Sequence, residues 1–253
     1  MATHAKMLFA EGWAKLDDVV PKELVNQAQE LFAKKYIRPE LGESAPDPEQ
    51  FDFPCSWVGD KRHMITIRAE GAFADPALYA NPAVIETLKE AMGPGFIIES
   101  YGVVLSMPGS EAQHTHRDGP GLFNHNIDNL LPMHAVTVVI PLIDMNATHG
   151  STSVWPGTHR DLQLKREDMK ERDPTVPVVP RGSVVLWDYR LFHGGNANLS
   201  STPRPILYLT YSRPWFADRN NWKKLVSLNV SQDFLDSVPD DLKFLFRYAT
   251  PLP

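Results

Sequence analysis

His116 and Asp118 are residues whose types and spacing could hold a divalent metal ion. They lie two positions apart in the segment EAQHTHRDGP, directly after the apolar run at 97–107. In a strand, residues i and i+2 point to the same face, so an imidazole and a carboxylate can reach one ion. His193, just beyond the apolar run at 184–187, is the third candidate ligand. Two histidines and one carboxylate with open positions suit Fe(II) and oxygen chemistry.

Arg204 adds a candidate anion site to this set of residues. It lies eleven residues after His193, follows the turn-rich stretch NANLSSTP and opens the apolar run at 205–212. A hairpin of that length would bring its guanidinium into the cavity of the metal ligands. The planar fork of arginine matches a carboxylate with two parallel hydrogen bonds. We therefore expect Arg204 to anchor the distal carboxylate of a co-substrate such as 2-oxoglutarate.

Each of these residues also has a simpler interpretation. His114 and His116 are two positions apart as well and could form a pair without Asp118. Asp118 could be a turn-forming residue, which the Gly and Pro that follow it would suit. Arg204 could be a surface cation, although it opens an apolar strand.

The other histidines and several aromatic residues are open to two interpretations. His125, His134 and His149 could contact substrate or the metal ligands, or could be ordinary satisfied polar side chains. We expect His159, in the segment PGTHR, to bond backbone rather than a metal. Three large aromatic residues could line a substrate pocket or belong to the core: Trp187, Phe192 and Trp215.

The composition is that of an ordinary globular protein. A chain of 253 residues that is 43% hydrophobic and 22% charged is expected to form one domain. A net charge of −6, without a basic block, argues against a nucleic-acid partner. No stretch approaches the roughly 20 apolar residues that span a bilayer, so we expect a cytoplasmic protein without a membrane partner.

Cys55 is the only cysteine, which excludes an internal disulfide and leaves histidine and carboxylate as metal ligands. A homodimer is left open.

Two kinds of periodicity predict the elements that must position these residues. Apolar residues at helical spacing predict helices at 21–36 and 82–92, separated by an irregular loop at 38–54. Short β-branched and aromatic runs predict strands at 96–107, 134–144, 182–188 and 205–212. A short surface helix is expected within 162–173. We expect a single domain over 1–253, with a helical part at about 1–95, an antiparallel β core at about 96–215 and a tail at 216–253.

The chain resembles the phytanoyl-CoA hydroxylase-like (PhyH) family of Fe(II)/2-oxoglutarate-dependent dioxygenases. The resemblance covers most of the chain and runs in order through five segments: GWAKLDDVVPKELVNQAQELF, PGSEAQHTHRD, HAVTVVIPLIDMNATHGSTSVWPGTHR, GSVVLWDYRLFHGG and STPRPILYLTYS. It implies a mainly β fold with flanking helices, a double-stranded β-helix of the cupin-like jelly-roll type. The metal would lie at one mouth of that fold.

The resemblance also implies roles for individual residues. The metal triad and catalytic centre fall on His116, Asp118 and His193, and the co-substrate anchor falls on Arg204. The resemblance further implies that Gln113 and Thr137 contact 2-oxoglutarate. The implied cofactors are Fe(II) and O2, with ascorbate as a candidate reductant. Because relatives that halogenate have a small residue in place of the carboxylate, Asp118 favours hydroxylation, with release of succinate and carbon dioxide.

The substrate is expected to be a free small molecule. Specificity should depend on the loops around the mouth, at 40–68, at 119–133 and after 214. The middle loop offers a mixed surface made of Phe123, Asn124, His125, Leu130 and Met133. These loops carry no evident basic cluster for a coenzyme A carrier, which favours a secondary metabolite or an amino-acid-derived compound.

Other functions fit parts of the same pattern. The same iron site could give desaturation, epimerisation, rearrangement or endoperoxide formation. A jelly-roll binding module could retain a metal without catalysis, and a zinc hydrolase could use two histidines and a carboxylate. An intact triad together with Arg204 argues against both of these last two.

Overall fold

The centre of the molecule is a large antiparallel sheet, in a computed structural model that describes residues 3–119, 121–123, 126–219, 221–222 and 225–252. Its seven strands follow the order β1-β7-β5-β9-β4-β3-β2, and every neighbouring pair runs antiparallel. The strands are β1 (Trp13–Leu16), β2 (Cys55–Gly59), β3 (Arg62–Thr66), β4 (Ile97–Ser106), β5 (Ala135–Pro141), β7 (Val184–Asp188) and β9 (Arg204–Ser212).

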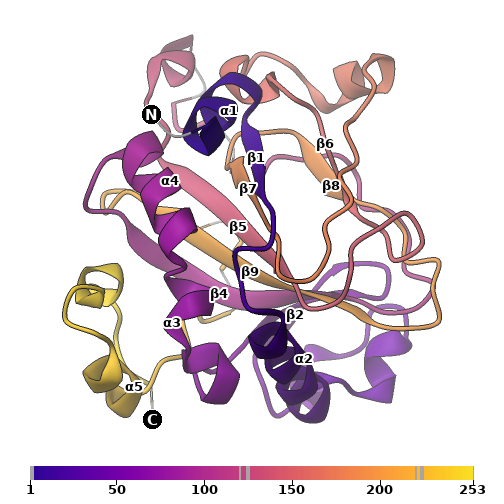
Figure 1. The fold of residues 1–253 in the computed structure, drawn as a ribbon. Helices are drawn as coiled ribbons and strands as arrows, with labels where there is room; N and C mark the ends of the chain where they lie inside the picture. The colour runs from indigo at the N-terminus through magenta and orange to yellow at the C-terminus, as the bar shows by residue number, and fades with distance from the viewer. Residues whose placement is uncertain (1–2, 120, 124–125, 220, 223–224, 253) are drawn as a thin grey trace.

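A small second sheet faces one side of the large one. It consists of β6 (Thr152–Val154) and β8 (His193–Gly195), which pair antiparallel. Figure 1 shows this pair on the side of the large sheet opposite to helices α3 and α4. Two facing antiparallel sheets with helices outside agree with the predicted mainly β architecture.

Helices cover the outer face of the large sheet. They are α1 (Thr3–Glu11), α2 (Lys22–Tyr36), α3 (Pro76–Tyr79), α4 (Pro82–Met92) and α5 (Gln232–Ser237). Short 3-10 helices occur in the connecting segments, at Pro39–Gly42, Pro48–Gln50, Gly71–Ala74, Asn126–Leu130, Thr158–Arg160, Arg166–Glu171 and Lys243–Phe246. The two predicted long helices, α2 and α4, are confirmed. Asn81 caps α4 by accepting from the backbone of Ala83 and Val84, and Gly93 at φ +76° ends it.

Alternation along the strands creates two separate cores. In β5, Val136 and Val138 pack with the helices in the larger core. Val139 points the other way, into a smaller core between the two sheets that also holds Val185 and Ile206. Because side chains alternate along a strand, residues of the same parity as Val139, including Thr137, also face the interior between the sheets. This interior holds the residues expected to do chemistry.

The first third of the chain differs from the sequence prediction. Strands β1, β2 and β3 lie within the part that was expected to be helical, and β2 and β3 form one edge of the large sheet. The predicted loop at 38–54 contains two short 3-10 helices, and the charged stretch at 162–173 contains another. Strand β3 is hard to recognise because it begins with Arg62 and His63, two polar residues that are buried through tertiary contacts.

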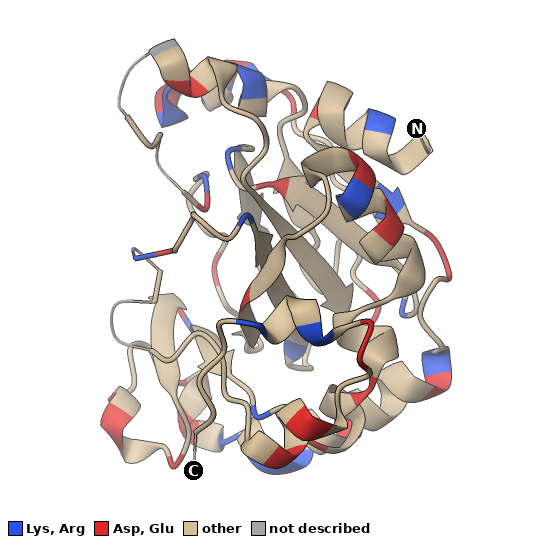
Figure 2. Ribbon diagram, turned by 90° about the vertical axis from the view of Figure 1, so that its left-hand side faces the viewer, with Lys and Arg blue, Asp and Glu red and all other residues tan. Residues whose placement is uncertain are grey.

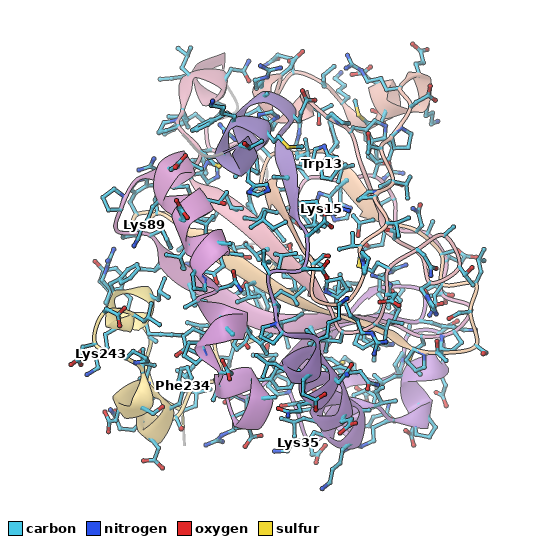
Figure 3. The ribbon with its side chains drawn as sticks, viewed as in Figure 1. Trp13, Lys15, Lys35, Lys89, Phe234 and Lys243 are labelled. Atoms are coloured by element: carbon cyan, nitrogen blue, oxygen red, sulfur yellow. The ribbon has the colours of Figure 1, made fainter. Side chains whose placement is uncertain are left out.

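Charged side chains lie mainly outside the cores. Figure 2 shows Lys and Arg interspersed with Asp and Glu over the helices and loops that surround the sheets. Lys35, Lys89 and Lys243 lie at the periphery in Figure 3. Among the described residues, no helix is both long and apolar enough to cross a membrane.

Candidate metal and carboxylate site

His116, Asp118 and His193 come together between the two sheets. His193 opens β8, and its backbone pairs with that of His116 through two N–H···O bonds of 2.9 Å. Each of the three side chains offers one ligand atom, and these atoms lie within 4.8 Å of one another. His116 belongs to a single bridge rather than to a long strand, yet Asp118, two residues on, reaches the same point. The structure therefore brings together the three residues that the sequence predicts as metal ligands.

Backbone contacts orient both imidazoles in the same way. Nδ1 of His116 lies 2.8 Å from the carbonyl oxygen of His114, and Nδ1 of His193 lies 3.0 Å from that of Leu191. A proton on Nδ1 that is donated to a carbonyl leaves the lone pair of Nε2 for a metal. Nε2 of His193 lies 3.4 Å from Oδ1 of Asp118, a separation that two ligand atoms at about 2.1 Å from one ion can have. The donor set fits a divalent ion such as Fe(II).

Burial and charge in this cluster favour the protonation states of metal ligands at His116 and Asp118. Burial lowers the pKa of His116 to about 4, and His193 adds to the effect. Burial alone would raise the pKa of Asp118, but His193 and His116 outweigh it and hold that pKa well below its usual range. For His193, burial is outweighed by Asp118, so its pKa is raised. An ionised carboxylate thus stands beside a neutral His116.

Thr137 and Trp187 contact the carboxylate of Asp118. The Thr137 hydroxyl donates to Oδ2 at 2.7 Å, and the indole Nε1 of Trp187 donates to the same oxygen at 2.9 Å. The resemblance places Thr137 among the co-substrate contacts; in the structure its hydroxyl is engaged by Asp118 and lies 3.3 Å from the Tyr208 hydroxyl. Trp187 is therefore both a buried core residue and a partner of the proposed metal ligand.

Arg204 is fully buried, and a second arginine accompanies it. Arg62, Ser106 and Arg204 occupy paired positions on the adjacent strands β3, β4 and β9. Nη2 of Arg204 donates to Oγ of Ser106 at 2.6 Å, whereas its Nε and Nη1 have no partner among the described residues. Burial, with a smaller effect of Arg62, lowers the pKa of Arg204 to about 9. A surface position for Arg204 is excluded.

Arg62 has the same kind of unsatisfied donors. Its Nη2 donates to the backbone oxygens of Glu111 and Asn196, while Nε and Nη1 are buried without a partner in the described parts of the chain. Burial lowers its pKa to about 10. Two buried guanidiniums with free N–H groups favour binding of an anion, because an unpaired buried charge is costly. A carboxylate of 2-oxoglutarate fits this position.

Gln113 links the metal segment to β8. Its Oε1 accepts from the backbone N–H of Gly195 at 3.1 Å, and its Nε2 lies 3.5 Å from the carbonyl oxygen of Val58. Gly195 provides room here, since a Cβ would lie 2.8 Å from both Oε1 of Gln113 and Nη1 of Arg62. Gln113 therefore connects the segment of His116 and Asp118 to Gly195, beside the Arg62 guanidinium.

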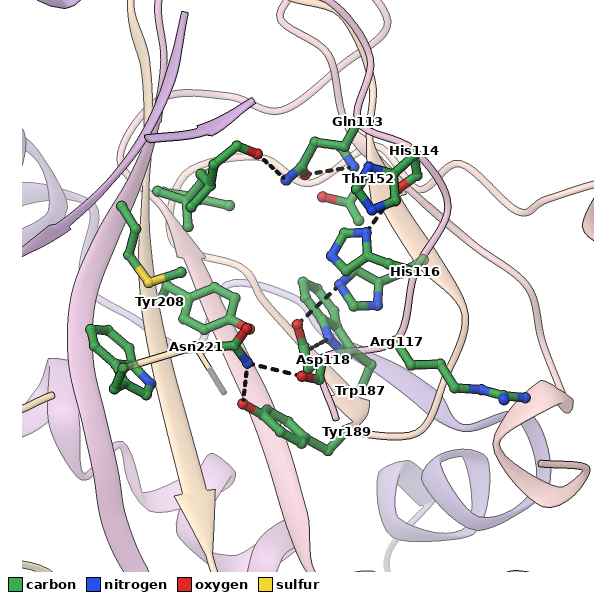
Figure 4. A pocket seen from close by; sticks show the side chains of 17 residues that line it. Gln113, His114, His116, Arg117, Asp118, Thr152, Trp187, Tyr189, Tyr208 and Asn221 are labelled. Carbon is green, nitrogen blue, oxygen red and sulfur yellow. Dashed lines mark hydrogen bonds and ion pairs between the residues drawn. The ribbon is translucent and has the colours of Figure 1, made fainter. Parts of the chain in front are cut away.

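A cavity of about 320 Å³ adjoins the three metal ligands. Figure 4 shows Tyr208 across this cavity from His116, with Gln113 towards one end and Tyr189 towards the other. Its apolar lining comes from Val58, Met64, Val104, Ile206 and Trp222. Ile206 is the next inward-facing residue after Arg204 on β9, which places the arginine beside the cavity rather than in its lining.

The three predicted substrate loops contribute unequally to this cavity. The segment 40–68 provides Val58 and Met64, and the tail provides Asn221 and Trp222. The described residues of the insert at 119–133 are absent from the lining: Phe123 and Leu130 are exposed, and Met133 is buried in the helix-side core. Asn124 and His125 lie outside the described residues. The described residues of the insert at 119–133 therefore do not support the prediction that this loop forms a substrate-binding surface.

The remaining candidates have ordinary structural roles. His159 contacts the carbonyl oxygen of Phe9 through Nε2, as expected. His134 is buried against Phe216 and has no hydrogen-bond partner among the described residues. Phe192 is buried beneath the guanidinium of Arg117, Trp215 is largely exposed, and Cys55 is buried.

The sequence prediction missed Arg62, Tyr208 and Asn221. Tyr208 has the same parity as Arg204 on β9, so strand alternation could have placed it inside. The Asn221 amide donates to the backbone oxygen of Asp118 at 2.9 Å, a contact across more than one hundred residues. Neither this contact nor the position of Arg62 has a local signal in the sequence.

Comparison with known proteins gives a family and a fold. The family described as phytanoyl-CoA dioxygenase (PhyH) matches residues 10–206. The dioxygenase FrzG of Cladobotryum sp is 31% identical over 112 residues, 41% of this chain and 36% of that protein. The chain thus spans about a third of the length of the curated relatives it matches.

Two solved structures share the fold at low sequence identity. The non-heme alpha-ketoglutarate-dependent epimerase SnoN from nogalamycin biosynthesis aligns with a TM-score of 0.60 and 15% identity, over 83% of this chain and 81% of that one. HygX from Streptomyces hygroscopicus, with nickel, 2-oxoglutarate and hygromycin B bound, aligns with a TM-score of 0.61 and 15% identity, over 86% and 89%. The predicted jelly-roll fold with flanking helices is confirmed.

Proposed function

This chain belongs to the phytanoyl-CoA dioxygenase family, and we propose that it is an Fe(II)- and 2-oxoglutarate-dependent dioxygenase. Its reaction is the hydroxylation of a small-molecule substrate, with release of succinate and carbon dioxide. One observation carries the proposal: the ligand atoms of His116, Asp118 and His193 converge in a site that also has two buried guanidiniums, Arg62 and Arg204, whose Nε and Nη1 have no hydrogen-bond partner among the described residues. A site that binds only a metal ion gains nothing from two nearby cations. A dicarboxylate, by contrast, can accept hydrogen bonds from both guanidiniums.

Different residues bind the metal and the co-substrate. Nε2 of His116, Nε2 of His193 and Oδ1 of Asp118 would hold Fe(II), and Arg204 would hold the distal carboxylate of 2-oxoglutarate. When bound, iron and 2-oxoglutarate together supply the activation of O2 that oxidises the substrate. The protein orients the co-substrate through Arg204 and Gln113, and the apolar side chains of Val104 and Ile206 exclude water from the reacting atoms.

The substrate would be a free small molecule bound in the cavity beside the three metal ligands, where Val58, Met64 and Trp222 form part of the lining. The lining combines these apolar side chains with polar ones such as His114, Arg117 and Asn221, which supports a compound that has both apolar surface and several polar groups. Secondary metabolism as its source is supported by two fold neighbours, one named for nogalamycin biosynthesis and one holding hygromycin B. A cytoplasmic location stays a prediction from the sequence, ascorbate as reductant stays an implication of the family resemblance, and a homodimer stays open.

Epimerisation is a second outcome for the same site, favoured by the fold shared with an epimerase. The outcome depends on where a substrate carbon lies relative to the metal, so product analysis distinguishes it from hydroxylation. A non-catalytic module and a zinc hydrolase leave the buried pair of Arg62 and Arg204 without a role.

Anaerobic reconstitution with Fe(II) and 2-oxoglutarate tests the proposal. The wild type is expected to show the weak visible charge-transfer band of 2-oxoglutarate chelated to iron. His116→Ala should lose the band through loss of iron, and Arg204→Ala should require at least about ten times more 2-oxoglutarate. His114→Ala is the matched control, since His114 lies in the same segment outside the triad, and should keep the band. Iron binding without any band, or binding of zinc alone, would refute the dioxygenase function.

A further inference from the structure

The two carboxylate oxygens of Asp118 have different surroundings. Oδ1 faces Nε2 of His193 at 3.4 Å, on the side where the ligand atoms converge. Oδ2 accepts two hydrogen bonds, from the Thr137 hydroxyl at 2.7 Å and from the Trp187 indole at 2.9 Å. Two donors on one oxygen leave the other as the better-placed ligand atom.

This difference matters for how many positions remain open on the metal. A carboxylate can bind through one oxygen or through both, and binding through both occupies an additional coordination position. A six-coordinate ion with three one-atom protein ligands keeps three positions, two for 2-oxoglutarate and one for O2. With a two-oxygen carboxylate only two positions would be left.

We propose that Thr137 and Trp187 are positioning residues that hold Asp118 as a one-oxygen metal ligand and thereby keep a coordination position open. The proposal rests on the proposed function, since it concerns the metal bound by the same triad. Neither residue needs to touch substrate or co-substrate for this role. Thr137, which the sequence suggests as a co-substrate contact, acts instead through Asp118.

The large sheet fixes both donors rigidly. Thr137 on β5 and Trp187 on β7 are directly paired positions in adjacent strands, so their side chains leave the same face together. Thr137 is fully buried and Trp187 is 2% exposed. Donors held by a sheet keep their direction better than donors on a loop.

Tyr208 completes the arrangement. The Thr137 hydroxyl has one proton, which it donates to Asp118, so in its 3.3 Å contact with Tyr208 the Thr137 oxygen accepts. A phenol is protonated at neutral pH, so Tyr208 can make this donation. Tyr208, on the cavity wall, thus adds a second contact to the Thr137 hydroxyl.

Counting the waters on a bound ion tests the proposal without turnover. Mn(II) is loaded in place of Fe(II), and the water-proton relaxation rate per bound ion reports how many exchangeable waters the ion carries. The variants are Thr137→Val, which keeps the shape and removes the hydroxyl, Thr137→Ser, which keeps the hydroxyl, and Trp187→Phe. Thr210→Val is the matched control: Thr210 is buried, is paired with Thr137 across β5 and β9, and has no hydrogen-bond partner among the described residues.

The expected result is a loss of water specific to the missing donor. Thr137→Val and Trp187→Phe should lower the relaxation rate per ion by up to roughly one third, as one of three waters is displaced. Both should weaken 2-oxoglutarate binding to the Mn(II) form on the order of 10-fold. Thr137→Ser and Thr210→Val should match the wild type.

The outcomes separate this proposal from the function on which it rests. If the wild type binds no Mn(II), or if 2-oxoglutarate displaces no water from the bound ion, the dioxygenase function fails. If the wild type behaves as expected while Thr137→Val and Trp187→Phe keep its relaxation rate and its 2-oxoglutarate affinity, the positioning role of these residues is overturned. Thr137→Val decides the matter alone if Trp187→Phe does not fold.

Discussion

Arg62 and Arg204 lie on either side of Ser106, in paired positions of three adjacent strands, and both guanidiniums are buried with N–H groups that no described residue accepts. Two like charges in a buried position oppose folding unless an anion joins them. The protein without co-substrate therefore carries an electrostatic cost that binding of a carboxylate removes. This relationship links the stability of the fold to occupancy of the site.

Replacement of Arg204 by methionine should stabilise the protein while abolishing its response to 2-oxoglutarate. Methionine has a similar volume and carries no charge, so the free energy of unfolding of the ligand-free protein is expected to rise by about 1–3 kcal/mol. Thermal denaturation with and without 2-oxoglutarate measures both effects. If the ligand-free Arg204→Met variant is less stable than the ligand-free wild type, the buried arginine pair does not destabilise the fold.

Arg190 provides a matched control for that substitution. It is also buried, but its guanidinium forms a 2.7 Å ion pair with Asp188. Arg190→Met leaves the Asp188 carboxylate unpaired and should lower the free energy of unfolding by about 3–5 kcal/mol. If the two substitutions change the free energy of unfolding in opposite directions, then ion pairing, and not burial alone, decides how each arginine contributes to stability.

Substitution of Gln113 should impair co-substrate binding more than metal binding. Gln113→Leu removes the acceptor for the backbone N–H of Gly195, beside Nη1 of Arg62, but touches none of the three metal ligands. Titration of the charge-transfer band should show an affinity for 2-oxoglutarate about 10-fold weaker. Iron stoichiometry, measured on the same samples, should not change; loss of iron would place Gln113 in the metal site instead.

His134 should make the protein less stable in mild acid. Burial, together with Arg190, lowers its pKa to about 4, with Asp188, Asp128 and Arg213 as the other charged neighbours. The unfolded chain binds the proton near pH 6.5 and the folded chain only near pH 4, so stability falls as the pH drops between these values.

The size of that effect can be measured with one variant. Between pH 7 and pH 5, His134 is expected to remove about 2 kcal/mol of stability. Denaturant unfolding of His134→Phe at the two pH values should show a difference smaller than the wild-type difference by that amount. An unchanged difference would mean that His134 is protonated in the folded protein at pH 5.

Gly150, in the segment NATHGS, should tolerate no side chain. Its φ is +80°, and a Cβ would lie 2.4 Å from the backbone oxygen of Ala197, just after β8. Gly93 has a similar φ of +76°, but a Cβ at that position would have no neighbour within 4 Å among the described residues. Gly93→Ala should therefore cost about 1–2 kcal/mol from backbone strain alone, and Gly150→Ala clearly more. Equal losses in denaturant unfolding would disprove the role of the close contact.

The sequence predicted the elements that depend on local pattern. Helices α2 and α4 have apolar residues at helical spacing, and α4 has its cap residues Asn81 and Gly93. Strands β4, β5, β7 and β9 are continuous β-branched and aromatic runs. Strand β3 was missed because its buried Arg62 and His63 contradict the pattern of a core strand, and their burial depends on partners far along the chain.

For the candidate site, too, the sequence predicted some features and the tertiary structure decided others. Sequence by itself determined which side chains could hold iron and a carboxylate, because the chemistry of His116, Asp118, His193 and Arg204 belongs to the residue types and their spacing. Only the tertiary structure decided that Arg62 joins Arg204, and that Thr137 and Trp187 bind one oxygen of Asp118. Periodicity tells which face of a strand a residue occupies, but strand order and register decide which residues become its neighbours.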